Sequence, residues 1–313
     1  MKTTDNILYL PFVKLSGAGN DFVLIDQTRL HSAIERYDTL AKAICDRHRG
    51  VGADGLLVYK SHDSLDFEMD YYNADGSSGA MCGNGGRCIA AYHFDVHGKD
   101  KRSVKFMAFD TIYTARTNGD TISVHMKDPS HILTDITINV DGTEIVCHYI
   151  DTGTPHVVVF TDELYKFYPD ASFDDFDIQY LGGRIRRHEA FRPLGTNVNF
   201  VEPLQDNQIA IRTYERGVEN ETLACGTGSV ASAVITVLQL QQKPPVQVIT
   251  RSDDIMSVHF SADVQNKKIT DVILAGTWMY HFTGTVIIDK NLNYAGIRHL
   301  PDSIIQQPDS SIV

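Results

Sequence analysis

The sequence has few cysteines and no long apolar run. Its five cysteines in 313 residues are an odd number and too sparse for a disulfide framework, which favours a reducing compartment. No stretch approaches the roughly 20 apolar residues that a membrane helix needs. The N-terminal segment MKTTDNILYLPFVKL is interrupted by Pro11 and has no small-residue cleavage site after it. We therefore expect a cytoplasmic protein with no membrane partner.

Basic charge and metal-binding patterns are also scarce. The net charge is −12 and there is no basic run, which argues against nucleic acid as a partner. The chain contains neither a C-x-x-C pair nor an H-E-x-x-H motif, and its 13 histidines are scattered. We therefore expect no metal site.

Helix and strand patterns alternate along the first third of the chain. Strands are predicted at FVLID (22–26) and LDFEMDYY (65–72), and a helix is predicted over 39–50, with its final glycine as the C-cap. Asn118-Gly119 and Asp141-Gly142 each stand between two alternating runs, a strong hairpin signal. The pattern indicates an α+β fold with mixed or antiparallel sheet, and not a doubly wound parallel sheet.

One unusual feature occurs twice. MCGNGGRC (81–88) and ACGTGSVA (224–231) each place a cysteine before a glycine-rich turn that opens an alanine-bearing apolar run. Each run is long enough for a buried helix and is followed by strand-rich sequence. The repeat predicts two similar halves, which would enclose a cleft between them.

The predicted halves have approximate boundaries. Residues 1–128 form an N-terminal lobe that carries Cys82 and is completed by about 285–300. Residues 129–284 form a C-terminal lobe that carries Cys225, and the proline-containing segment 301–313 is predicted to be a surface tail.

Two cysteines at helix starts suit a particular chemistry. Unsatisfied N–H groups and the helix dipole should stabilise a thiolate and lower the thiol pKa, and glycines let a carboxylate approach the backbone. Two such turns around one molecule can remove a proton from a stereocentre and return one to the opposite face. This favours a racemase or epimerase that uses no cofactor. Cys45, Cys88 and Cys147 lack the glycine pattern and are expected to be buried bystanders.

A second interpretation treats GTGSVA (226–231) as a dinucleotide fingerprint of a nicotinamide oxidoreductase. The preceding ENETLA does not have the pattern of a strand, and no βαβ unit surrounds it. The epimerase interpretation is therefore favoured.

Between about Phe12 and Gly296 the chain closely resembles the diaminopimelate epimerase family. Six separated motifs carry the resemblance: GAGNDFVLID, RGVGADGLLV, YYNADGSSGAMCGNGGRC, TGTPHVV, GTNVNFVE and RTYERGVENETLACGTGS. The resemblance implies two similar lobes of mixed or antiparallel sheet wrapped around a central helix, with the active site in the cleft between them. It also implies an isomerase that links LL- and meso-diaminopimelate in lysine and peptidoglycan synthesis. A homodimer would be compatible with it.

The resemblance also assigns roles to residues. Cys82 and Cys225 match the acid/base pair, and His156 and Glu215 match a pair that lines the catalytic centre. The remaining matches are backbone donors to the α-carboxylate and substrate-contacting side chains; these are Gly83, Asn84, Gly226, Thr227, Asn20, Asn73, Asn197 and Arg216. Arg216 suits a bidentate pair with the distal carboxylate.

Two positions depart from the family pattern. Gly55 stands where some members have a glutamine that faces the substrate, and Thr154 stands where an asparagine often contacts its distal end. Thr154 keeps a hydrogen-bonding side chain, whereas Gly55 has none. Racemases of the proline or histidine type and related cofactor-free isomerases therefore remain alternatives.

Overall fold

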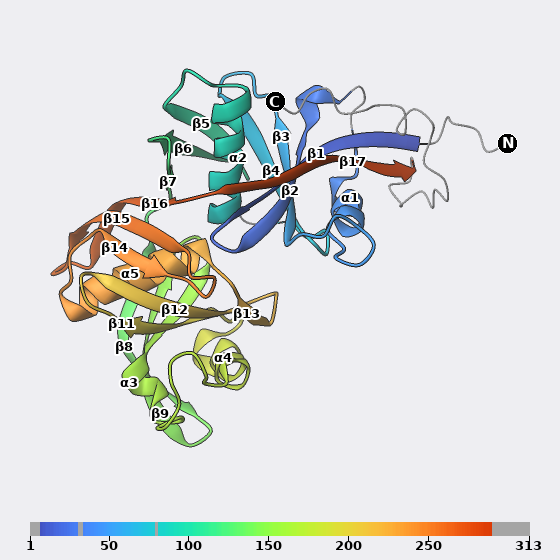
Figure 1. Ribbon diagram of the computed structural model, residues 1–313. Helices are drawn as coiled ribbons and strands as arrows, with labels where there is room; N and C mark the ends of the chain where they lie inside the picture. Colours follow the sequence, from blue (N-terminus) through green and yellow to red (C-terminus); the bar gives the residue numbers. More distant parts are fainter. Residues whose placement is uncertain (1–6, 31–33, 79–80, 290–313) are drawn as a thin grey trace.

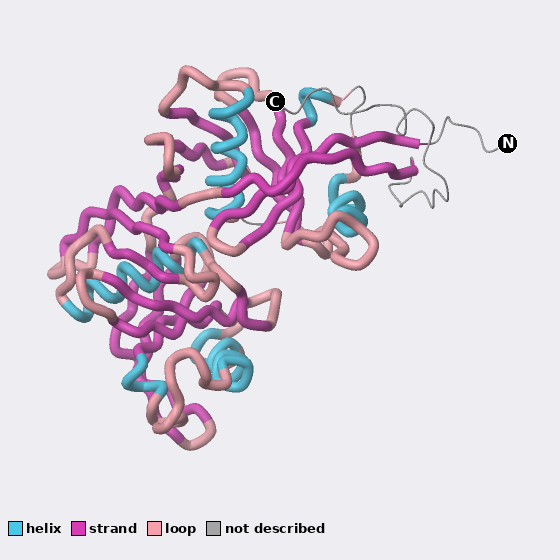
Figure 2. The backbone as a smooth tube through the Cα atoms, in the orientation of Figure 1, coloured by secondary structure: helices cyan, strands magenta, loops and turns pink. Residues whose placement is uncertain are grey.

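The computed structural model describes residues 7–30, 34–78 and 81–289. The chain forms two lobes, drawn one above the other in Figures 1 and 2, and each lobe wraps sheet around one long helix. Four of the strand pairings are parallel (β2–β3, β4–β5, β10–β11 and β12–β14), and the other pairings of the described strands are antiparallel. The predicted α+β fold of two similar lobes is confirmed.

The described part of the first lobe contains two α-helices and the strands that surround them. Its elements are β1 (Ile7–Gly17), β2 (Asn20–Asp26), α1 (Tyr37–Ile44), β3 (Gly55–Lys60), β4 (Phe67–Asn73), α2 (Gly83–Val96), β5 (Ser103–Ala108), β6 (Thr111–Thr117), β7 (Ile122–His125) and β17 (Met279–Asp289). Strand β17 pairs antiparallel with β1 from its first residue, Met279 opposite Ser16. The chain therefore re-enters this lobe earlier than the predicted 285–300. The predicted tail, 301–313, lies outside the described residues.

The second lobe contains the elements between β7 and β17. They are β8 (Ser130–Val140), β9 (Thr143–Asp151), β10 (Pro155–Phe160), α3 (Thr161–Leu164), α4 (Ile178–Arg186), β11 (Asn197–Pro203), β12 (Gln208–Glu215), β13 (Asn220–Thr222), α5 (Gly226–Leu240), β14 (Val246–Ile249), β15 (Ile255–Asp263) and β16 (Lys268–Gly276). Strand β16 pairs antiparallel with β7 of the first lobe, so the hydrogen-bonded sheet continues from one lobe to the other.

The two central helices are buried on nearly every side. Helix α2 buries each residue from Gly83 to Phe94, and α5 buries Gly226 and Gly228–Val237. A helix without a polar face is stable only inside a core. Side chains of both helices belong to one continuous hydrophobic cluster, which holds the starts of the helices in fixed positions.

Most of the predicted elements are present. The strand at 22–26 lies in β2, that at 65–72 overlaps β4, and the two hairpins join β6 to β7 and β8 to β9. The helix predicted over 39–50 is wrong beyond Ile44, because α1 ends there. The side chain of Asp46 accepts hydrogen bonds from the N–H groups of His48 and Arg49, which favours a turn over further helix.

Candidate active site

Each of the two cysteines caps the start of a central helix. Cys82 is the N-cap of α2 and Cys225 is the N-cap of α5, both with extended backbone conformation. The Sγ of Cys82 accepts a hydrogen bond from the N–H of Gly85 at 3.4 Å, and that of Cys225 from the N–H of Gly228 at 3.4 Å. The two repeated motifs therefore build the same local structure.

The two helix starts touch each other. A Cβ placed on Gly226 would lie 3.5 Å from the Cα of Gly83 and 3.4 Å from Oδ1 of Asn84. The Cδ2 atom of Leu274 lies beneath both glycines, 3.1 Å from that Cβ and 3.2 Å from one placed on Gly83. Motifs that are far apart in the sequence thus form one surface with two helix N-termini.

This surface opens into a cleft of about 1280 Å³, lined by residues of both lobes. Most small-molecule pockets measure about 300–1,000 Å³, so the cleft is large enough to hold a small molecule. The predicted residues that line it are Asn20, Asn73, Cys82, Gly83, Thr154, Asn197, Glu215, Arg216, Cys225, Gly226 and Thr227. Gly55, Asn84 and His156 are not among the lining residues.

The thiols are less acidic than their position at helix starts predicts. Burial raises the pKa of Cys82 to about 11 and that of Cys225 to about 12, and the N–H donors of Gly85 and Gly228 oppose this only in part. The expected lowering of both pKa values is therefore wrong for the free protein. Burial destabilises a thiolate more than the helix start stabilises it. The nearby carboxyl group of Glu215 raises the pKa of both thiols further.

His156 lies behind the cleft, which corrects its predicted place on the cleft wall. It is fully buried, and burial lowers its pKa to about 3, so its imidazole is neutral. Its Nδ1 is 3.0 Å from Nδ2 of Asn199, and its Nε2 is 3.0 Å from Oγ1 of Thr227. Since the Asn199 amide nitrogen donates to Nδ1, the imidazole proton is on Nε2, which lies 3.0 Å from the hydroxyls of both Thr227 and Thr154.

The hydrogen bonds on both sides of His156 run in one direction. Thr213 donates from its hydroxyl to Oδ1 of Asn199 at 3.0 Å, which fixes the orientation of that amide. At the other end, Thr227 Oγ1 accepts from His156 and lies 3.4 Å from Sγ of Cys225. The hydroxyl proton of Thr227 is thus available to the Cys225 sulfur, where it would stabilise a thiolate.

A smaller network supports the first helix start. Asn84 is buried and donates from Nδ2 to Oδ1 of Asn20 at 2.6 Å. Asn20 in turn donates to Oδ2 of Asp54 at 3.1 Å, while Arg47 holds Oδ1 of the same carboxylate at 2.7 Å. Asn20 therefore has one amide hydrogen left for a ligand in the cleft.

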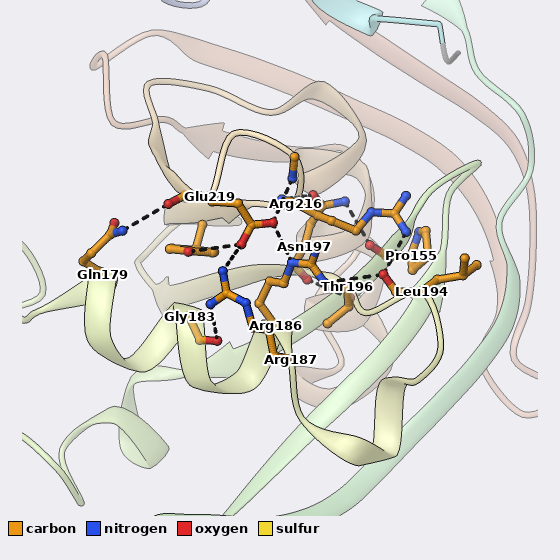
Figure 3. Close-up of polar contacts among 12 residues, drawn as sticks. Pro155, Gln179, Gly183, Arg186, Arg187, Leu194, Thr196, Asn197, Arg216 and Glu219 are labelled. Atoms are coloured by element: carbon orange, nitrogen blue, oxygen red, sulfur yellow. Dashed lines mark hydrogen bonds and ion pairs between the residues drawn. The ribbon is translucent and has the colours of Figure 1, made fainter. Parts of the chain in front are cut away.

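Arg216 is a cation on the cleft wall without an ion pair among the described residues. Its Nη1 donates to the carbonyl of Leu194 at 3.4 Å (Figure 3). The neighbouring carboxylate in the same turn, Glu219, is already bound by Arg186 at 2.9 Å and Arg187 at 2.5 Å. The guanidinium of Arg216 therefore remains free to bind an anion of a ligand.

Asn197 holds the Arg216 turn in place. Its Oδ1 accepts a hydrogen bond from the N–H of Arg216 at 2.8 Å, and its Nδ2 donates to the carbonyl of Pro155 at 2.9 Å (Figure 3). One amide hydrogen of Asn197 remains for a ligand.

Glu215 and Thr154 complete the wall near the Cys225 helix. Glu215 is half-buried, and burial raises the pKa of its carboxyl group. The hydroxyl oxygen of Thr154 lies 3.0 Å from Nε2 of His156 and 3.4 Å from Oγ1 of Thr227. It therefore faces the start of α5.

The buried residues that support the site were not predicted from the sequence. Asn199 and Thr213 were not singled out, although Asn199 follows Asn197 by two residues on a strand, which places both on one face. Tyr71 and Asp54 also line the cleft and were missed. Cys45, expected to be a bystander, lines the cleft but is almost fully buried, and burial raises its pKa to about 12.

Comparisons with known proteins agree with this geometry. The family model of diaminopimelate epimerase matches residues 12–132 and 148–270. A diaminopimelate epimerase of Aquifex aeolicus is 39% identical over 286 residues, which cover 88% of this chain and 97% of that protein. One of Archaeoglobus fulgidus is 40% identical over 238 residues, 72% of this chain and 81% of the relative.

Solved structures share the fold at low sequence identity. A PhzF-family phenazine biosynthesis protein of Bacillus anthracis aligns with a TM-score of 0.68 at 16% identity, covering 89% of this chain and 99% of that one. A hydroxyproline epimerase of Agrobacterium vitis aligns with a TM-score of 0.66 at 12% identity, covering 90% and 92% of the two chains.

Proposed function

Since the chain belongs to the diaminopimelate epimerase family, we propose that Cys82 and Cys225 exchange the α-proton of diaminopimelate and interconvert its LL and meso forms. One observation carries this proposal: two cysteines cap two helices whose starts touch and open into one cleft. A thiolate on one side removes the proton, and the thiol on the other side returns one, so that configuration inverts.

The helix starts would bind the reacting end of the substrate. In an α-helix the first N–H groups have no acceptor within the helix, and here they belong to Gly83 and Asn84 in α2 and to Gly226 and Thr227 in α5. A carboxylate between the two starts would accept hydrogen bonds from both and lie along both dipoles. These donors would also stabilise the negative charge that develops on the adjacent carbon during proton removal.

One thiol must lose its proton before it can act as the base. Burial favours the neutral form of both in the free protein. An ammonium group of the substrate adds positive charge near the sulfurs, which favours a thiolate. The hydroxyl of Thr227, held by His156, offers a further hydrogen bond to the Cys225 sulfur. Glu215 lines the cleft, where its carboxyl group would accept a hydrogen bond from a substrate ammonium.

The distal end would be recognised by Arg216 together with the amides of Asn73 and Asn197. Within the described part of the chain Arg216 has no carboxylate partner, whereas Arg186 and Arg187 share Glu219. A distal carboxylate supplies the missing anion. The free cation favours diaminopimelate over the proline or histidine alternatives, because those amino acids carry no second carboxylate.

The cellular setting follows from the family and the composition. We expect a cytoplasmic enzyme that supplies meso-diaminopimelate for lysine and peptidoglycan synthesis, without a cofactor or a nucleic-acid partner. No helix in the described part of the chain is both long and apolar enough to span a membrane. A homodimer is compatible with this proposal.

An incubation with LL-diaminopimelate in deuterated water tests the function. We expect deuterium at the α-carbon together with meso product, because the returned proton comes from a thiol that exchanges with solvent. The same incubation with proline, histidine and lysine, none of which carries a second carboxylate, serves as the control. Turnover of any of these at a comparable rate would contradict the distal-carboxylate assignment, and unchanged diaminopimelate would contradict the activity.

A further inference from the structure

The missing side chain at position 55 makes room for Tyr71. A Cβ placed on Gly55 would lie 2.4 Å from Cε2 and 3.0 Å from Cζ of the Tyr71 ring, and 2.7 Å from the carbonyl oxygen of Tyr72. Side-chain carbons do not approach this closely. The volume next to the backbone of Gly55 is therefore occupied by the Tyr71 ring, which also packs edge-on against Phe22 with ring centroids 6.1 Å apart.

Tyr71 brings a hydroxyl group into the cleft. The residue is half-buried in β4 and lines the cleft together with Asn73, Cys82 and Glu215. Its O–H donates to Oδ1 of Asn73 at 2.8 Å. Burial raises the pKa of Tyr71, and the surrounding acidic groups raise it further, so the phenol keeps the proton that it donates.

This hydrogen bond decides which end of the Asn73 amide faces a ligand. With Oδ1 occupied by Tyr71, Nδ2 of Asn73 donates one hydrogen to Oγ of Ser77 at 2.9 Å and has a second to offer. Without the Tyr71 hydroxyl, the amide could rotate and present its oxygen instead. An oxygen at this place would repel a carboxylate, whereas an N–H group attracts one.

We propose that Tyr71 is a specificity-determining residue that fixes the Asn73 amide with its N–H group toward the substrate carboxylate, in a space that only Gly55 leaves open. The inference rests on the proposed function, since it takes the ligand to be diaminopimelate. It also accounts for the departure at position 55: the polar group that the glycine lacks is supplied by the neighbouring strand, two residues before Asn73.

Tyr71→Phe tests the proposal because it removes only the hydroxyl. Loss of one hydrogen bond corresponds to roughly a threefold to tenfold change in binding. We expect KM for LL-diaminopimelate to rise by that factor, with kcat within about twofold and an unchanged thermal midpoint. Tyr72→Phe is the matched control, because Tyr72 stacks on Tyr37 with centroids 6.2 Å apart and does not line the cleft.

A double-mutant cycle shows whether Tyr71 acts through Asn73. In an Asn73→Ala background the Tyr71→Phe change should alter KM by less than about twofold. A full effect in that background, or an unchanged KM for Tyr71→Phe alone, would overturn the proposal.

Calorimetric Kd values for LL-diaminopimelate, measured for the same variants in a Cys225→Ala background, separate this inference from the proposed function. If the wild-type protein binds LL-diaminopimelate but does not turn it over, the proposed function fails, while the Kd series in the Cys225→Ala background still decides the role of Tyr71. A wild-type protein that binds no diaminopimelate overturns both.

Discussion

Gly83 and Gly226 meet at the contact between the two central helices, where a Cβ on Gly226 would lie 3.5 Å from the Cα of Gly83. Each residue directly follows the cysteine that caps its helix. The distance between the two thiols is therefore set by backbone contact, and a side chain at either glycine would alter it.

Gly226→Ala should lower kcat by about tenfold, because the new methyl group would lie only 3.1 Å from Cδ2 of Leu274 and fill the contact with Gly83, which would shift one thiol relative to the other. Steady-state kinetics would measure this. The control is Gly183→Ala, also in a helix, where an added Cβ comes no closer than 3.5 Å to its surroundings. Equal activity of both variants would argue against control of thiol spacing by this contact.

Cys82→Ala and Cys225→Ala should each reduce epimerisation by about a thousandfold or more. Inversion needs a proton donor on each face, so one thiol cannot replace the other. Cys88→Ala and Cys147→Ala remove buried thiols outside the cleft and should cost about 1 kcal/mol of unfolding free energy without loss of kcat. Activity within tenfold of the parent for either Cys82→Ala or Cys225→Ala would refute the two-base assignment.

The value of kcat/KM should rise about tenfold per pH unit between pH 7 and 9. Burial raises the pKa of Cys82 to about 11 and that of Cys225 to about 12, so the thiolate fraction of the free protein grows throughout this range. The same shift makes folding less favourable above about pH 9, where the unfolded thiols ionise and the folded ones do not. A plateau of kcat/KM below pH 8 would contradict the raised pKa values.

Thr227→Val should lower kcat by about tenfold, whereas Thr227→Ser should retain most of it. Valine keeps the shape but removes the hydroxyl that lies 3.0 Å from His156 and 3.4 Å from the Cys225 sulfur. The valine variant also leaves the Nε2 hydrogen of His156 with only Thr154 as a partner. Equal kcat for valine and serine would show that the hydroxyl has no part in proton transfer.

Arg216→Met should raise KM for diaminopimelate by roughly 10- to 100-fold, the range expected for a hydrogen bond to a charged group. Thermal unfolding should change little, because among the described residues the guanidinium donates a hydrogen bond only to the carbonyl of Leu194 and forms no ion pair. Arg186→Met is the control: it breaks an ion pair with Glu219 and should reduce stability more than KM. A stable Arg216→Met variant with unchanged KM would place the distal carboxylate elsewhere.

The sequence by itself determined the local structure of the site. An N-cap cysteine followed by glycines acts within one helical turn, and Asn-Gly or Asp-Gly between alternating runs specifies a hairpin within a few residues. Because such signals involve near neighbours, Cys82 and Cys225 could be assigned to helix starts, and β6–β7 and β8–β9 to hairpins. The helix over 39–50 was predicted too long because the side chain of Asp46 forms a local turn that apolar spacing does not encode.

The tertiary structure decided the properties of the site that depend on burial and on contacts with residues far away in the sequence. The thiol pKa values rise because the surrounding lobes exclude water, which a cap motif does not show. His156 lies behind Thr227 because β10, β11 and β12 bring it beside Asn199 and Thr213. Among the described residues Arg216 has no ion pair, because Arg186 of α4 and the next residue, Arg187, bind the neighbouring Glu219. Tyr71 occupies the space beside Gly55 because the two residues lie on adjacent strands. Each of these depends on contacts between segments far apart in the chain, which only the fold brings together.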